Sequence, residues 1–205
     1  EDGILKKILV TGCLAQRYAD EVISEIPEVD GVIGIGANAD IVAVCDAIFE
    51  NDEVYSSFPD KELLPLDGGR ILTTPEYTAY LKIADGCSNC CSYCAIPSIR
   101  GAFRSRKMED VIEEANALCE KGVKEIILVA QDTTRYGEDL YGSLKLPELL
   151  GELNKIEKLK WIRLLYCYPE RVTDELLDAI AENEKVCHYI DIPMQHADGE
   201  ILKAM

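Results

Sequence analysis

Three cysteines in one short segment of the sequence have the spacing of iron–sulfur ligands. The segment reads Asp85-Gly-Cys-Ser-Asn-Cys-Cys-Ser-Tyr-Cys94, and Cys87, Cys91 and Cys94 in it follow the pattern C-x3-C-x2-C. Three thiolates can hold three irons of a cubane cluster, so the fourth iron stays open to a ligand that is not protein. A catalyst needs such an open iron, whereas an electron carrier does not. Gly86 allows close backbone approach, and Tyr93 can lie over an adenine or shield the cluster.

Zinc is the competing interpretation of this segment. A structural zinc site wants four ligands, usually in two separated pairs. Cys90 is available as a fourth thiolate, but its side chain would diverge from that of its neighbour Cys91, and no second cysteine pair or His-x3–5-His lies nearby. Because Cys87-x2-Cys90 and Cys90-x3-Cys94 also exist, Cys90 leaves an alternative ligand set open. The sequence favours iron–sulfur over zinc.

The composition excludes other classes of protein. The 205 residues include nine cysteines, and an odd number of them, crowded near Cys87, suits metal ligation in a reducing cytosol better than a disulfide framework. A net charge of −17 disfavours nucleic-acid binding by this portion and attracts a basic protein partner, although it also simply favours solubility. No apolar run reaches the ~18–20 residues of a membrane span, and no signal peptide opens the chain. The first residue is Glu1 and the last segment resembles a truncated helix, so we expect a fragment of a longer polypeptide.

The chain before the cysteines reads as a small α/β unit followed by a linker. In residues 1–50 we expect strands at 7–10 and 31–35 and helices at 15–26 and 39–49, the second helix capped by Asn38. From residue 51 to 76 no regular apolar period survives, and prolines and glycines punctuate the segment, so an interdomain linker is predicted there.

Strands and helices alternate in residues 77–205. We expect strands at 80–84, 125–130, 161–165 and 189–192, and helices at 108–121, 146–156 and 173–183. Repeated βα units predict a parallel sheet with helices outside, and four strands are too few for a closed barrel. Sites in such folds lie where strands end, so the loops to watch are 85–107, 131–145, 166–172 and 193–198.

Several polar residues in or near these loops are candidates for binding. Arg100, Arg104, Arg106 and Lys107 form a basic cluster in an acidic chain, and we favour Arg100 for clamping a carboxylate over the alternative of a solvated loop. Gln131 and Asp132 follow a strand and can bond ribose hydroxyls or position a substrate, or else cap a turn.

Three further polar residues lie in or near the strands. Arg163 lies mid-strand among apolar neighbours, where a buried guanidinium needs polar partners, so we expect it to point into a polar barrel interior. His196 follows a strand and faces the active side or supports a loop, and His188 reads as structural.

The cysteine segment resembles the signature of radical S-adenosylmethionine (SAM) enzymes, which carry Cys-x3-Cys-x-aromatic-Cys. The continuation to Arg106 is similar to the methylthiotransferases of that group, and residues 128–137, Leu-Val-Ala-Gln-Asp-Thr-Thr-Arg-Tyr-Gly, resemble the branch that modifies a ribosomal protein, the RimO type. The transfer-RNA branch usually has a Gly-Gln-Asn-Val type of sequence there. Residues 162–169 and 191–197 also match. Cys90 departs from the pattern, because the family does not normally carry cysteine at that position.

The resemblance implies a function and its cofactors. The fourth iron of a [4Fe-4S] cluster on Cys87, Cys91 and Cys94 would chelate S-adenosylmethionine. From their positions in the sequence, Tyr93, Arg100, Gln131 and Arg163 are our further candidates for binding this cofactor. Reduction then yields a deoxyadenosyl radical that abstracts hydrogen from an unactivated carbon, where a methylthio group is installed. A second [4Fe-4S] cluster sits on three cysteines of an N-terminal domain in the full-length family members. Cys13 matches the last of these ligands, so we expect the fragment not to bind that cluster stably.

The sequence therefore predicts an α/β protein with a partial (β/α) radical SAM barrel preceded by the end of a small α/β N-terminal domain. The domains expected are the end of the cluster-binding domain at 1–50, the linker at 51–76 and the truncated radical SAM core at 77–205. The resemblance implies a cytoplasmic enzyme that methylthiolates the β-carbon of an aspartate in the twelfth small-subunit ribosomal protein. It also implies a flavodoxin-like or ferredoxin-like electron donor, no membrane and no direct nucleic-acid binding by this fragment. A transfer-RNA methylthiotransferase and a non-catalytic iron–sulfur electron carrier or zinc scaffold are the alternatives.

Overall fold

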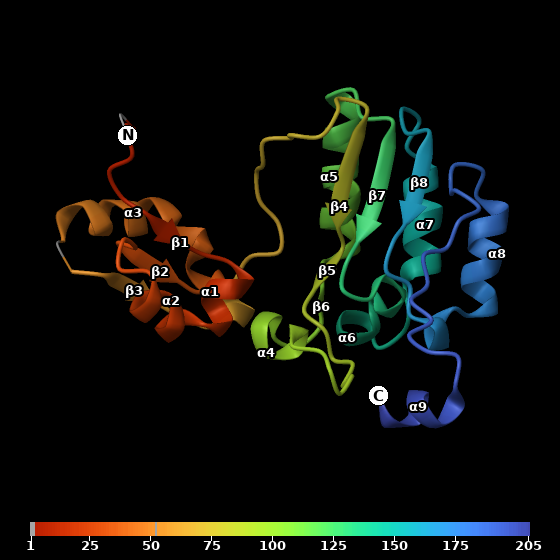
Figure 1. The fold of residues 1–205 in the computed structure, drawn as a ribbon. Coiled ribbons are helices and arrows are strands. Elements are labelled where there is room, and N and C mark those ends of the chain that lie inside the picture. The colour runs from red at the N-terminus through yellow and green to blue at the C-terminus, as the bar shows by residue number, and fades with distance from the viewer. Residues whose placement is uncertain (1–2, 52) are drawn as a thin grey trace. The chain divides into compact units, whose positions relative to one another are not determined.

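The computed structural model describes residues 3–51 and 53–205, and these fold into two compact units (Figure 1). The first unit holds the described residues up to Pro65 together with Cys94–Ala102, and the second holds Leu66–Tyr93 and Phe103–Met205. Both units are mixed α/β, as the sequence predicts. The predicted ranges 1–50 and 51–76 include residues 1, 2 and 52, which lie outside the described part.

The first unit is a parallel sheet with short helices around it. Its strands, in the order β1-β2-β3, are Leu9–Val10, Gly31–Ile33 and Tyr55–Ser57. Its helices are α1 (Cys13–Arg17), α2 (Ala19–Glu25), α3 (Ile41–Glu50), α4 (Ile96–Arg100) and the 3₁₀ turns η1 (Ile35–Asp40) and η2 (Lys61–Leu63). The central strand β2 is buried along its whole length, because α2 and α3 bury apolar side chains against it.

Three details of this unit differ from the sequence expectations. The helix expected at 15–26 is broken at Tyr18, whose φ of −129° and ψ of 41° are not helical. Asn38 does not cap the following helix, because it lies inside η1 and its side chain accepts a 2.5 Å hydrogen bond from the Thr11 hydroxyl. The segment without a visible pattern contributes strand β3, which pairs with β2 through backbone hydrogen bonds that need no apolar alternation.

The second unit is built on a parallel sheet of three strands in the order β4-β7-β8, formed by Thr78–Lys82, Glu125–Val129 and Trp161–Leu164. Helices α5 (Met108–Glu120) and α7 (Leu146–Asn154) cover one face (Figure 1). In β4 the alternation is visible, because Ala79 and Leu81 are buried while Tyr80 between them is exposed. The three strands of this sheet and helices α5 and α7 are those expected, within one to two residues at most ends.

The ends of the helices follow local signals in the sequence. Gly122, at φ +107°, stops α5. Thr173 caps α8 (Asp174–Glu182), accepting a 3.3 Å hydrogen bond from the Leu176 amide. Both features were expected from the sequence.

The prediction of a strand at 189–192 is wrong. In its place the chain makes one isolated parallel bridge, Ile162 with Val186, and then continues without regular pairing. Ile190 and Ile192 pack against the core, which explains the apolar pattern without a strand. The described residues therefore contain three parallel strands in this unit and no closed barrel.

Short elements follow the carboxyl ends of the strands. After β4 the chain forms β5 (Ala84–Asp85), which pairs antiparallel with β6 (Arg104–Ser105) and so closes the base of the cysteine loop. After β7 come η3 (Thr133–Arg135) and α6 (Glu138–Tyr141); after β8 comes η4 (Pro169–Arg171), and α9 (Gly199–Ala204) is the last helix. No helix in the described ranges has the length and apolarity to cross a bilayer.

Candidate functional site

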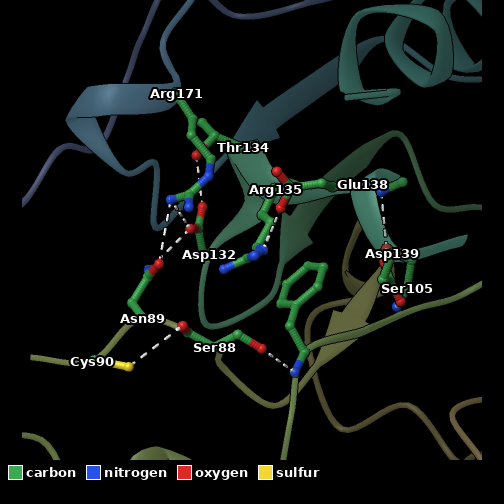
Figure 2. A network of polar contacts seen from close by, with 12 residues as sticks. Ser88, Asn89, Cys90, Ser105, Asp132, Thr134, Arg135, Glu138, Asp139 and Arg171 are labelled. Atoms are coloured by element: carbon green, nitrogen blue, oxygen red, sulfur yellow. Dashed lines mark hydrogen bonds and ion pairs between the residues drawn. The ribbon is translucent and has the colours of Figure 1, made fainter. Parts of the chain in front are cut away.

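A buried carboxylate joins three of the loops that follow the strands of the second unit (Figure 2). Asp132 lies three residues after the end of β7 and is 1% exposed. Its Oδ1 accepts a 2.6 Å hydrogen bond from the Thr134 hydroxyl, and its Oδ2 accepts bonds of 3.1 Å from Asn89 Nδ2 and 3.1 Å from Arg171 Nη1. Three of the four loops predicted to carry the site therefore meet at one residue.

The loop after β8 supplies the positive charge of this network. Arg171 ends η4, and its Nη1 also donates to Asn89 Oδ1 at 3.3 Å. Its guanidinium carbon lies 5.4 Å from the centre of the Tyr168 ring, within cation–π range. The Tyr168 amide in turn donates to Thr134 Oγ1 at 3.1 Å, so the two loops are connected through both side chains and backbone.

Backbone strain accompanies this arrangement. Tyr166 has φ +60° and Gln195 has φ +57°, and both lie in the left-handed region that non-glycine residues rarely adopt. The Tyr166 carbonyl accepts from the Thr133 amide at 3.0 Å, and its amide donates to Asp191 Oδ2 at 2.9 Å. These bonds hold the strained residue in place.

The cysteine loop is tied down at several points. The Ser88 hydroxyl accepts from the Phe103 amide at 3.0 Å, the Ser92 amide donates to the Met205 carbonyl at 2.6 Å, and the Tyr93 hydroxyl donates to Gln195 Oε1 at 2.6 Å. Gly86 takes a φ of +75°, which a side chain would disfavour. The loop is therefore held by residues that follow it in the sequence, as far away as the last helix.

The donors in this loop suit an iron–sulfur cluster by their chemistry. The structure contains no disulfide among its described residues; Cys87 is buried, and Cys91 and Cys94 are half-buried. Cys87 and Cys91 belong to the second unit, whereas Cys94 opens the segment that groups with the first. Among residues 3–51 and 53–205, no three Cys, His, Asp or Glu side chains are gathered as they would be around a metal ion. The fit thus rests on donor type and spacing.

Tyr168 lies beside Cys91, the second cysteine of the C-x3-C-x2-C motif. Burial raises the pKa of its phenol, and the adjacent Cys91 side chain raises that pKa further. A tyrosine hydroxyl beside a cysteine sulfur can tune the electronic properties of that sulfur by hydrogen bonding. Cys90, by contrast, is exposed, and its sulfur lies 4.0 Å from the Ser88 carbonyl.

The predicted cofactor-binding residues lie in different settings. Tyr93 is 56% exposed and bonded to Gln195, Gln131 is exposed, and Arg100 is half-buried at the end of α4 in the first unit. Arg163 does not stand unpaired, because its Nη2 lies 3.0 Å from Glu125 Oε1 on the neighbouring strand and its guanidinium carbon lies 5.5 Å from the Tyr189 ring centre. The Glu125 hydrogen bond is the main reason why the pKa of Arg163 is raised.

The basic cluster after the cysteines is divided by the fold. Arg106 is 5% exposed; its Nη1 lies 2.6 Å from Glu114 Oε2 and donates to the Lys82 carbonyl at 2.8 Å. This arginine is therefore part of the core rather than a solvated loop. Lys107 is exposed at the start of α5.

The remaining predicted residues are placed as follows. Cys13, the expected ligand of the second cluster, is half-buried and begins α1 directly after Gly12, which has φ +99°. His196 supports its own loop, because its Nδ1 accepts a 2.9 Å hydrogen bond from the Asp198 amide. His188 is exposed.

Sequence reasoning missed two members of the network, Asn89 and Arg171. Asn89 lies between Cys87 and Cys90, in a segment dominated by candidate metal ligands, and Arg171 lies two residues after Pro169 in a segment without periodicity. A signal was available, since both fall in loops predicted to converge. Asp132 was a candidate only beside Gln131, and the structure shows that Asp132 is the buried one.

Residues 81–205 match the profile of the radical SAM superfamily. The chain belongs to this superfamily, as its cysteine motif predicts. The residues of the network described above, Asn89, Asp132, Thr134 and Arg171, all lie within the matched part of the chain.

Curated relatives extend the likeness to almost the whole chain. It is 54% identical over 206 residues to ribosomal protein uS12 methylthiotransferase RimO of Desulforamulus reducens, covering 100% of this chain and 46% of the relative. It is 56% identical over 194 residues to the RimO of Caldanaerobacter subterraneus, covering 94% and 44%. The chain therefore spans about half the length of the curated relatives that it matches.

A solved structure also aligns with part of the chain. The radical S-adenosylmethionine methyltransferase TsrM of Kitasatospora setae aligns with a TM-score of 0.49 and 19% identity, over 62% of this chain and 24% of that one.

Proposed function

We propose that this chain is part of an enzyme that methylthiolates the β-carbon of an aspartate in ribosomal protein uS12. The observation that carries the proposal is identity above 50% to uS12 methylthiotransferases of several bacteria across nearly the whole chain. The stretch Gln131-Asp-Thr-Thr134 supports the same branch, and the structure gives it a role, since Asp132 is the centre of the buried network.

Cys87, Cys91 and Cys94 would hold a [4Fe-4S] cluster with S-adenosylmethionine on its open iron. When bound, this pair supplies the radical chemistry that breaks an unactivated carbon–hydrogen bond, which no side-chain acid or base can break. The protein's own contribution is to hold the loop in one conformation and to exclude water. Ser88, Asn89 and Tyr93 serve the first task through their hydrogen bonds to residues of other segments.

Tyr93, Arg100, Gln131 and Arg163 remain our candidates for contacting S-adenosylmethionine, with Tyr93 in the motif itself and Gln131 exposed beside Asp132. Cys13 is the candidate ligand of a second [4Fe-4S] cluster whose other ligands would lie elsewhere in the full-length protein. We assign the described residues up to Pro65, strand β3 included, to that cluster domain and 77–205 to the radical SAM core, so that the linker predicted at 51–76 is shortened to 66–76.

The substrate and its surroundings follow from charge and cysteine content. A net charge of −17 suits a basic ribosomal protein better than a nucleic acid. Nine cysteines suit a reducing cytoplasm, and a flavodoxin-like or ferredoxin-like protein would supply the electron.

The test is a methylthiolation assay with the full natural chain. After anaerobic reconstitution with iron and sulfide, the protein is incubated with S-adenosylmethionine, a reductant and purified uS12, and the uS12 peptides are sequenced by mass spectrometry. We expect a methylthio group on one aspartate, its loss with Cys91→Ala and its absence when that aspartate is changed to asparagine. Modification of transfer RNA with uS12 left unchanged would assign the chain to the other branch.

A further inference from the structure

Asn89 is held at both ends of its side-chain amide. Its Nδ2 donates to Asp132 Oδ2 at 3.1 Å, and its Oδ1 accepts from Arg171 Nη1 at 3.3 Å, while the same Nη1 lies 3.1 Å from Asp132 Oδ2 (Figure 2). The Asp132 carboxylate therefore accepts a hydrogen bond from the donor end of the amide, and the Arg171 guanidinium donates one to the acceptor end. An aspartate or a leucine of similar size at position 89 could not make both bonds.

The two residues that hold Asn89 are themselves fixed to the sheet. Asp132 follows β7, the central strand, and its second oxygen is bonded to Thr134. Arg171 stacks on Tyr168, whose amide is bonded to the same Thr134 hydroxyl. Because the carboxylate is 1% exposed, its bonds are little weakened by water. The pair is thus an anchor on the rigid part of the unit, and Asn89 is the point of the cysteine loop attached to it.

The position of Asn89 in the sequence explains why this anchor matters for the cysteines. It lies two residues after Cys87 and two before Cys91, so fixing its side chain limits the conformations open to both cysteines. We propose that Asp132 and Arg171 are positioning residues: through their hydrogen bonds to the Asn89 side chain they set the conformation of the Cys87–Cys91 segment. The proposal rests on the proposed function only in taking this segment to be the cluster-binding one.

The first test uses the full chain without metal and follows the alkylation of individual cysteines by iodoacetamide and peptide mass spectrometry. Arg171→Gln and Asn89→Ala are compared with Arg135→Gln, a matched control. Arg135 has the same 21% side-chain exposure as Arg171 and an ion pair at 2.6 Å, but that pair is with Glu138. We expect Cys91 to react about tenfold faster or more in the first two variants, since one to two hydrogen bonds to charged groups are lost, and at the wild-type rate in Arg135→Gln.

The second test follows the reconstituted protein. We expect Arg171→Gln and Asn89→Ala to lose iron to a chelator about tenfold faster than Arg135→Gln and to broaden the electron paramagnetic resonance signal of the reduced cluster. Asn89→Ala leaves the Asp132–Arg171 pair in place, so it keeps the test decisive if Arg171→Gln unfolds.

Equal rates for Asn89→Ala, Arg135→Gln and the wild type in the alkylation test would overturn the proposal. If the wild type binds no cluster, the proposed function fails, and the alkylation rates still decide the role of the anchor.

Discussion

Replacing Glu114 by glutamine should destabilise the second unit, because it leaves the buried charge of Arg106 without its counter-ion. Glu114 lies on α5 between two guanidinium groups, with Oε2 2.6 Å from Arg106 Nη1 and Oε1 2.9 Å from Arg70 Nη2. The side chain of Arg70 is 39% exposed, whereas that of Arg106 is only 4% exposed. The substitution keeps the size of the side chain and removes the charge that compensates Arg106.

The expected loss of stability follows from how far the Arg70 and Arg106 side chains are exposed to solvent. The partly exposed pair with Arg70 contributes at most ~1 kcal/mol, because solvent screens it. Removing one partner of a buried pair costs about 3–5 kcal/mol. Arg106 keeps the carbonyls of Lys82 at 2.8 Å and Asp110 at 3.4 Å as acceptors, so we expect the lower end, about 3 kcal/mol in the free energy of unfolding.

Urea unfolding followed by tryptophan fluorescence measures this directly. Trp161 is the single tryptophan of the chain and lies in β8 of the same unit. The control is Glu113→Gln, an exposed neighbour on α5, which should change the free energy of unfolding by less than about 0.5 kcal/mol. Adding Arg106→Met to Glu114→Gln should recover part of the loss, because the unpaired charge is removed. Equal stability of Glu114→Gln and Glu113→Gln would refute the reasoning.

Three further predictions concern the second unit and its thiols. Thr173→Ala removes the cap of α8 and should lower the free energy of unfolding by about 1 kcal/mol in the same urea assay; an unchanged midpoint would contradict this. Tyr136→Phe removes a buried hydroxyl that donates to the Arg106 carbonyl at 3.0 Å, at a cost of about 1 kcal/mol. Burial raises the pKa of Tyr136, so above the unfolded value of ~10 the unfolded state binds fewer protons, and stability should fall with rising pH more in the wild type than in Tyr136→Phe. Burial also raises the pKa of the Cys167 and Cys119 thiols, so iodoacetamide at pH 8 should modify exposed Cys45 and Cys90 first; simultaneous reaction would show that these thiols are not buried.

The parts of the fold that the sequence predicts are those governed by local physics. The parallel strands and covering helices of the second unit follow from apolar periodicity, and Thr173 and Gly122 mark helix ends through caps that involve only neighbouring residues. Because parallel strands place their carboxyl ends on one edge, the convergence of the loops after them was also predictable.

The parts that were missed depend on residues far apart in the sequence. Strand β3 pairs with β2 in a segment without any pattern, and Ile190 and Ile192 are apolar because they pack against the core, not because they form a strand. Likewise, Asn89 and Arg171 are 82 residues apart, and nothing local marks either as the partner of the other. The pattern of apolar and polar residues indicates which side of a helix or strand is buried, but it does not indicate which polar groups bind one another.

Deoxyadenosine formation by the anaerobically reconstituted chain, reduced in the presence of S-adenosylmethionine, tests the central claim most directly. The claim predicts about four irons per chain on Cys87, Cys91 and Cys94, deoxyadenosine in the wild type and in Cys90→Ala, and none in Cys91→Ala. About eight irons would show instead that a second cluster is bound, against the expectation for Cys13. Deoxyadenosine that survives Cys91→Ala and disappears with Cys90→Ala would contradict the ligand assignment, and zinc binding without iron binding would contradict the claim as a whole.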